Sequence, residues 1–217
     1  MTTKGAVIAI VLMLGAALAG SAVLYPVLPD RVPTHWNLHG EVDHWSSKGF
    51  GCLGIPGLLL LPLVFLAVGD WLSPRQFKVG DFRFAFNYLM VILAGLFAYL
   101  HALVLAAALH PHASFARWLI GGIFLFFAWI GNLLGKTRRN FWIGIRTPWT
   151  LSSDAVWIAT HRFGARVFMA TGILGALAVA LGADPVWCFA LFLAAICVPV
   201  LYSFRLSKKL EKQQAGR

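Results

Sequence analysis

Three histidines and three carboxylates stand close together in one short polar segment, residues 30–44. Imidazole nitrogen and carboxylate oxygen are ligands that suit zinc and related divalent ions. The candidate ligands and bases of such a metal site are His35, His39, Glu41, Asp43 and His44. A metal-dependent hydrolase would need three converging ligands and an open coordination position. The segment does not contain the His-Glu-x-x-His arrangement that puts a general base beside two zinc ligands.

The same segment also fits a hydrogen-bonded turn at the level of lipid headgroups. Pro29 just before it, together with Pro33 and Gly40 within it, favours ordered turns over a long helix. Trp36 and Trp45 are typical of side chains that anchor a protein at the membrane interface. We favour this second interpretation and expect no cofactor, with a zinc-dependent membrane enzyme as the alternative.

A second polar segment, residues 135–166, combines aromatic side chains with arginines that would meet anionic headgroups, namely Arg138, Arg139 and Arg146. The Thr147-Pro148 pair interrupts any helix there. Ser152 or Ser153 is a candidate N-cap for a helix that follows. An elbow anchored at the membrane explains the arginines and aromatics. It does not explain the polar Arg-Thr-Pro-Trp-Thr sequence, which suggests a docking surface.

The composition places both segments in a membrane protein. The chain has 217 residues, of which 59% are hydrophobic and 12% charged, whereas soluble domains carry roughly 25% charged residues. The net charge of +10 lies at the ends of apolar segments rather than along one polar face. This distribution argues against direct binding of nucleic acid.

Six apolar segments are long enough to cross a bilayer, which predicts an all-α polytopic fold in a single domain, residues 1–217. The predicted spans are 6–27, 53–72, 84–109, 115–134, 165–181 and 185–204. With a cytoplasmic N-terminus, all of the 18 lysines and arginines except Arg31, Lys48 and Arg117 fall on the inner side. The positive-inside rule therefore predicts that both termini are cytoplasmic. Residues 28–52 then form an extracytoplasmic loop and residues 135–164 a cytoplasmic loop.

The two loops resemble the SdpI family of membrane proteins, which is named for an immunity protein against a secreted sporulation-delay toxin. The inner loop is similar to the family's motif at Asn140, Gly144, Ile145, Arg146, Thr147, Pro148, Trp149 and Thr150, then at Trp157, His161 and Arg162. The outer loop resembles a domain of unknown function often found ahead of that motif. This second resemblance involves Leu28-Pro29, Pro33, His35-Trp36-Asn37, Gly40, Asp43 and Lys48.

The resemblance implies a six-helix, non-enzymatic protein of the bacterial cytoplasmic membrane that gives resistance to a secreted, membrane-active toxin peptide. It further implies that toxin binding is relayed to a cytoplasmic transcriptional repressor. The expected partners are therefore the lipid bilayer, the toxin peptide and the repressor. A transporter is less favoured, because the spans contain few paired charges.

The resemblance also assigns roles to residues. On the toxin side it places His35, Asn37, Gly40 and Asp43. For the cytoplasmic partner and signalling it implies Asn140, Gly144, Arg146, Thr147, Pro148, Trp149, Thr150, Trp157 and His161.

Overall fold

The computed structural model describes residues 1–37, 40–75, 77–113 and 115–215 of the chain. Within this part, six helical segments are long and apolar enough to cross a membrane, and they confirm the predicted all-α, six-helix membrane fold. Three are single helices that match the predicted spans closely: α1 (Thr3–Leu24), α4 (Arg83–Leu109) and α5 (Ala116–Leu134). The second span is composite, formed by η1 (Phe50–Gly54), α2 (Ile55–Gly57) and α3 (Leu60–Leu72). A short 3-10 turn, η2 (Val79–Phe82), leads into α4.

The last two spans extend further than their apolar sequences indicate. The fifth is α7 (Asp154–Ala180), whose N-cap is Ser153, so the last eleven residues of the predicted 135–164 loop form the start of this helix. The N-cap prediction is confirmed, because the Ser153 hydroxyl accepts a hydrogen bond from the Val156 amide. The sixth is α8 (Pro185–Ala215), which continues beyond residue 204 into the basic C-terminal segment. A short helix, α6 (Pro148–Ser152), precedes α7.

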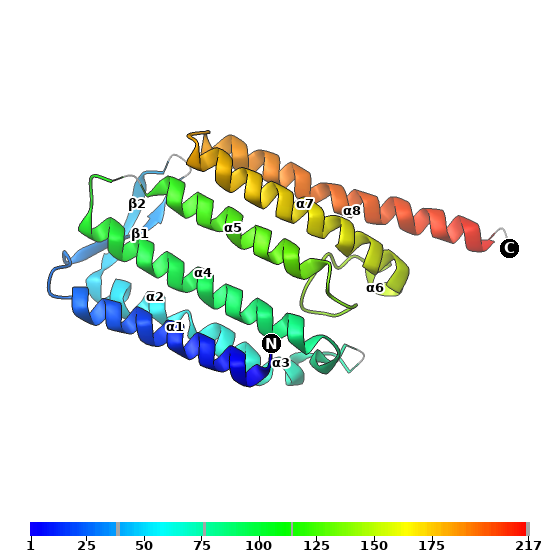
Figure 1. The fold of residues 1–217 in the computed structure, drawn as a ribbon, viewed down its shortest axis with the longest axis horizontal. Coiled ribbons are helices and arrows are strands. Elements are labelled where there is room, and N and C mark those ends of the chain that lie inside the picture. Colours follow the sequence, from blue (N-terminus) through cyan, green and yellow to red (C-terminus); the bar gives the residue numbers. More distant parts are fainter. Residues whose placement is uncertain (38–39, 76, 114, 216–217) are drawn as a thin grey trace.

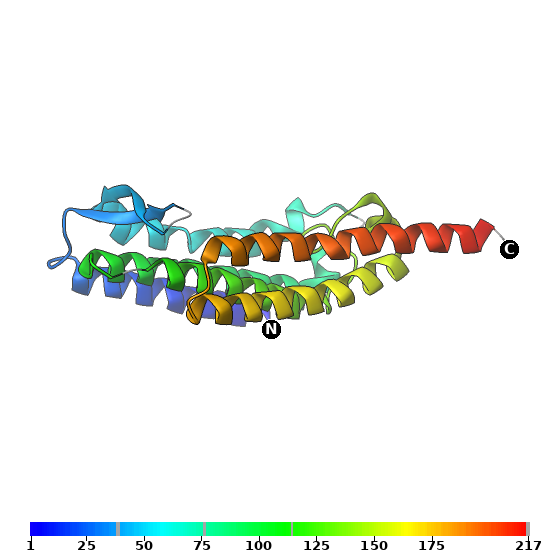
Figure 2. The ribbon, with the colours of Figure 1, turned by 90° about the horizontal axis from the view of Figure 1, so that it is seen from above.

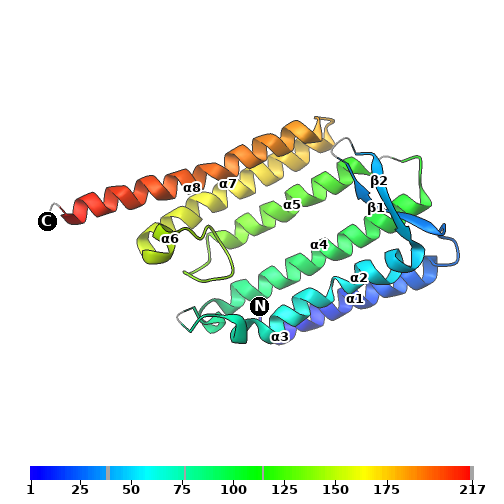
Figure 3. The same ribbon diagram turned by 180° about the vertical axis from the view of Figure 1, so that it is seen from behind.

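The helices form two groups of three that meet along α4 and α5 (Figure 1). In the N-terminal half, α1, the α2–α3 segment and α4 pack together around a cluster that includes Ile10, Leu66 and Phe86. In the C-terminal half, α5, α7 and α8 pack around Phe124 and Phe192. Because α5 packs far more extensively on α7 than on α4, the junction between the halves is much looser than the packing within the C-terminal half. The view from behind shows the same division (Figure 3).

Small residues allow the close approach of α5 and α7. A Cβ atom at Gly172 would lie 2.7 Å from the backbone nitrogen of Ala128, and one at Gly131 would lie 2.7 Å from that of Met169. In a membrane, where lipid chains are as apolar as leucine, such backbone approach is a main source of helix association. Large apolar side chains instead point outward, as Trp71 and Leu181 do, and these surfaces suit contact with lipid.

The outer loop forms an antiparallel hairpin of β1 (Arg31–Trp36) and β2 (Val42–Ser47), with register irregularities around His35. The sequence predicted turns here but no strands. Val32 is fully buried beneath the hairpin, in a cluster with Leu28, Cys52 and Leu105. The hairpin and α6 lie at opposite ends of the molecule (Figure 1), and α8 runs past the ends of the other helices (Figure 2).

Candidate functional site

The inner loop, residues 135–153, is organised around a buried asparagine. Asn140 is fully buried, and its side-chain oxygen accepts hydrogen bonds from the Trp142 and Ile143 amides at 2.8 and 2.7 Å. Its amide nitrogen donates to the carbonyl oxygens of Arg138, at 2.8 Å, and Ile143, at 3.2 Å. All of its hydrogen-bonding capacity therefore goes to shaping the backbone of its own loop.

His161 fixes the next part of the loop from α7. The Ile145 amide donates to Nε2 of His161 at 2.9 Å, and Nδ1 lies 2.8 Å from the Trp157 carbonyl oxygen. Since Nε2 accepts, the proton must sit on Nδ1, which makes this a neutral imidazole. Gly144 passes directly over the ring with a φ of +124°, and a Cβ atom there would lie 2.2 Å from Nε2. Only glycine satisfies both the backbone conformation and the available space.

Beside this contact, the Thr-Pro-Trp-Thr sequence forms α6 through a capping box. The Thr147 side chain accepts from the Thr150 amide, and the Thr150 hydroxyl lies 2.9 Å from the Thr147 amide that donates to it. Thr150 is fully buried, and its hydroxyl is also 2.7 Å from the Ile145 carbonyl oxygen. Pro148 occupies the first helical turn, where its missing N–H costs nothing. Helix capping therefore explains the choice of threonine and proline at the start of α6.

Two tryptophans tie this loop to α7 and α8. The indole of Trp157 is fully buried, stacks on His161 with centroids 3.9 Å apart, and donates to the Thr137 carbonyl oxygen at 3.0 Å. Trp149 donates from Nε1 to the buried Ser203 hydroxyl of α8 at 2.8 Å and packs edge-on against Phe204. Both indole nitrogens are therefore satisfied inside the C-terminal half.

A third tryptophan, Trp142, reaches the other half of the bundle and was not among the predicted site residues. Its Nε1 donates to the Ser73 hydroxyl, just after α3, at 2.6 Å. Its ring meets Phe65 and Phe86 edge-on at 5.7 and 5.3 Å. The structure thus packs this ring against the N-terminal core. In the sequence, only the proximity of Trp142 to Asn140 pointed to a role in the loop. No sequence pattern links Trp142 to Ser73.

The arginines of the inner loop have different environments. Arg139 forms an ion pair with Asp154 at 3.1 Å and donates to the Leu151 carbonyl oxygen. Arg146 is exposed, lies over the Phe141 ring and donates to the Phe141 carbonyl oxygen. Arg138 is exposed as well. The structure therefore uses Arg139 to fasten the loop to the start of α7 and leaves Arg146, Phe141 and Pro148 on the surface.

At the opposite end, the hairpin brings His35 and Asp43 together. The two side chains are 67% and 42% exposed, and His35 Nδ1 lies 2.6 Å from Asp43 Oδ1. Asn37 and Glu41 are joined by reciprocal contacts: the Asn37 amide group donates to the Glu41 carboxylate, and the Glu41 backbone amide donates to the Asn37 oxygen. Gly40, with a φ of +82°, packs against the first residue of α5, since its Cβ position would lie 2.3 Å from that of Ala116.

Only part of the proposed metal cluster is assembled. His44 stands opposite His35 in the strand register and is exposed, while His39 lies outside the described residues. Among the residues that the structure describes, no three His, Cys, Asp or Glu side chains gather closely enough to hold a metal ion. The His35–Asp43 pair alone provides two donors, fewer than the three protein ligands of a catalytic zinc site. The zinc hypothesis stays a prediction.

The fold and its two ends define a multi-pass membrane protein with an exposed hairpin at one end and a buried, hydrogen-bonded loop at the other. Residues 136–203 match the SdpI/YfhL protein family, and residues 12–60 match a domain of unknown function, DUF1648. The Immunity protein SdpI of Bacillus subtilis (strain 168) is 28% identical over 192 residues, which cover 88% of this chain and 90% of that protein. No solved structure matches the chain. These matches confirm the resemblance to the SdpI family seen in the two loops.

Proposed function

We propose that this chain is a non-enzymatic immunity protein of the bacterial cytoplasmic membrane, which protects its host from a secreted, membrane-active toxin peptide. The family-model match and the name of the Bacillus relative support this role. The hairpin is the proposed contact for the toxin, because it carries the exposed side chains of His35 and Asp43 and the half-buried Asn37 at one end of the bundle.

We further propose that toxin binding is relayed through α5 to a cytoplasmic repressor. The observation that carries this proposal is the position of α5. At one end its first residue, Ala116, supports Gly40 of the hairpin, and its other end leads directly into the inner loop. That loop holds α7 through His161, α8 through Trp149 and the N-terminal half through Trp142. A displacement of α5 would therefore be transmitted to both halves of the bundle. Such a shift requires that the toxin bind the two states with different affinity.

The exposed part of the inner loop is the proposed contact for the repressor. Arg146, Phe141 and Pro148 are on the surface, whereas Asn140, Thr150, Trp157 and His161 are buried. The buried residues then act by shaping the loop, and the exposed ones by touching the partner.

Survival of a toxin-sensitive bacterial strain tests the immunity role. Cells that express the chain are challenged with a sporulation-delay-type toxin peptide and compared with cells that carry an empty vector. Protection at a confirmed membrane abundance supports the proposal. Equal killing with and without the protein, at that abundance, overturns it.

The relay is tested separately by following a fluorescently tagged repressor. Wild type should move the repressor to the membrane fraction when toxin is added, and Arg146→Ala should abolish the movement while protection persists. If Arg146→Ala and Phe141→Ala both leave recruitment intact, the inner loop is not the docking surface.

Reporter proteins fused to the C-terminus test the proposed orientation in the membrane. Because both termini are proposed to be cytoplasmic, a fused fluorescent protein should be active and fused alkaline phosphatase should be inactive.

A further inference from the structure

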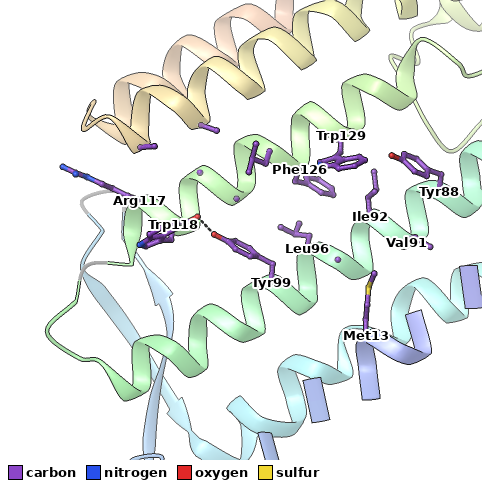
Figure 4. A pocket seen from close by; sticks show the side chains of 16 residues that line it. Met13, Tyr88, Val91, Ile92, Leu96, Tyr99, Arg117, Trp118, Phe126 and Trp129 are labelled. Carbon is purple, nitrogen blue, oxygen red and sulfur yellow. Dashed lines mark hydrogen bonds between the residues drawn. The ribbon is translucent and has the colours of Figure 1, made fainter. Parts of the chain in front are cut away.

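A large apolar cavity lies between α4 and α5, at the junction of the two halves (Figure 4). Its volume is about 1200 Å³. The walls are mainly aromatic and aliphatic, and the side chains that matter for the argument are Tyr88, Leu96, Tyr99, Trp118, Phe126 and Trp129. The Tyr99 hydroxyl is already used, because it donates to the Trp118 carbonyl oxygen at 2.5 Å. The cavity therefore offers apolar surface to whatever fills it.

One cation, Arg117, lines the cavity near the start of α5, and its guanidinium points outward, away from the aromatic walls (Figure 4). Arg117 is exposed and has no hydrogen-bond or ion-pair partner within the part of the chain that the structure describes. The other two cations of the same end are engaged: Lys48 lies 3.5 Å from the Asp30 carboxylate, and Arg31 donates to the Trp45 carbonyl oxygen. The guanidinium of Arg117 is thus the free positive group beside an apolar cavity.

We propose that this cavity binds one anionic phospholipid, with its phosphate at Arg117 and its acyl chains against the aromatic walls. A guanidinium matches phosphate oxygens in a two-pronged geometry. Flexible acyl chains can fill the irregular apolar space between α4 and α5. This inference does not depend on the immunity role.

Two glycines that line the cavity are suitable positions for substitutions that introduce a side chain into it. Gly121 and Gly95 both line it, and a Cβ atom at either would meet no heavy atom within 4 Å. Gly121→Phe should therefore place an aromatic ring inside the cavity without a clash at its base. Gly20→Phe is a matched control, because it adds the same ring to α1 at a position that is equally open and does not line the cavity.

The test is native mass spectrometry of the purified protein after exchange into detergent, with phosphatidylglycerol or phosphatidylethanolamine added back. We expect one tightly retained phosphatidylglycerol on the wild type. Arg117→Gln should weaken its binding about tenfold, as expected for the loss of a charge-assisted contact. Arg31→Gln, which removes an equal charge at the same end, should leave binding unchanged. Gly121→Phe should abolish retention of the lipid, and Gly20→Phe should not.

Size-exclusion profiles and melting temperatures establish that each variant is folded. If phosphatidylglycerol and phosphatidylethanolamine bind equally and Arg117→Gln changes neither, the site does not recognise an anion and the proposal is overturned. If Gly121→Phe retains lipid but loses crosslinking to an added membrane-active peptide, the cavity belongs to the peptide, and the proposal is again overturned.

Discussion

The hairpin and the inner loop differ in how their polar residues are used. In the hairpin, His35 and Asp43 meet in one exposed contact, and both remain available to a ligand. In the inner loop, Asn140, Thr150 and His161 are buried and fully engaged with backbone groups of the same loop or its neighbours. Because a buried polar group without a partner is costly, each of these residue types is determined by its surroundings. The inner motif is therefore mainly a structural device, whereas the His35–Asp43 pair of the hairpin is exposed.

The strongest test of this contrast is Gly144→Ala. The new methyl group would be forced against the His161 ring in a backbone conformation that only glycine adopts readily. We expect a loss of about 2–5 kcal/mol, seen as poor membrane expression and a large drop in melting temperature in detergent. Gly57→Ala, at a position with nothing within 4 Å, is the control. A normal melting temperature for Gly144→Ala would mean that the loop is not fixed by His161.

Asn140→Ala should have the next largest effect. It leaves the Trp142 and Ile143 amides without their acceptor, and each unpaired buried amide costs roughly 1–3 kcal/mol. Melting curves of the purified protein measure the loss. Asn132→Ala, which removes only an exposed contact with Lys136, should change little. Equal melting temperatures for the two variants would contradict the structural role of Asn140.

Trp149→Phe separates packing from hydrogen bonding. The ring can still meet Phe204, but the bond to Ser203 is lost, which should cost about 1 kcal/mol. Ser203→Ala should cost about the same, and the double variant should cost no more than either single one. Additive losses would show that the two residues act independently.

His35→Ala and Asp43→Asn should have the smallest effect on stability, within about 0.5 kcal/mol, because an exposed pair is screened by water. Protection against the toxin should nevertheless fall if the hairpin is the contact site. Survival assays at matched expression measure this. Full protection by both variants would move the toxin site away from this pair.

The amino-acid sequence by itself determined the six spans and the Ser153 helix cap, because both depend on local properties: apolar length and a hydroxyl before a helix. It also indicated which two loops carry the polar groups. It did not predict the β-hairpin, since the strands alternate weakly and are interrupted by irregular register. It predicted a helix after Ser152 or Ser153, but not that this helix runs without a break into the fifth span as α7.

Only the tertiary structure decided which residues meet. Trp142 reaches Ser73 across 69 positions, and the Ile145 amide finds His161 across 16. Neither contact follows a helical or strand period, so no local pattern could reveal it. The cavity beside Arg117 has the same origin, because it exists only where α4 and α5 fail to pack closely. Hydrophobicity fixes how many times this chain crosses the membrane, whereas the pairing of distant polar groups decides the shape of its two ends.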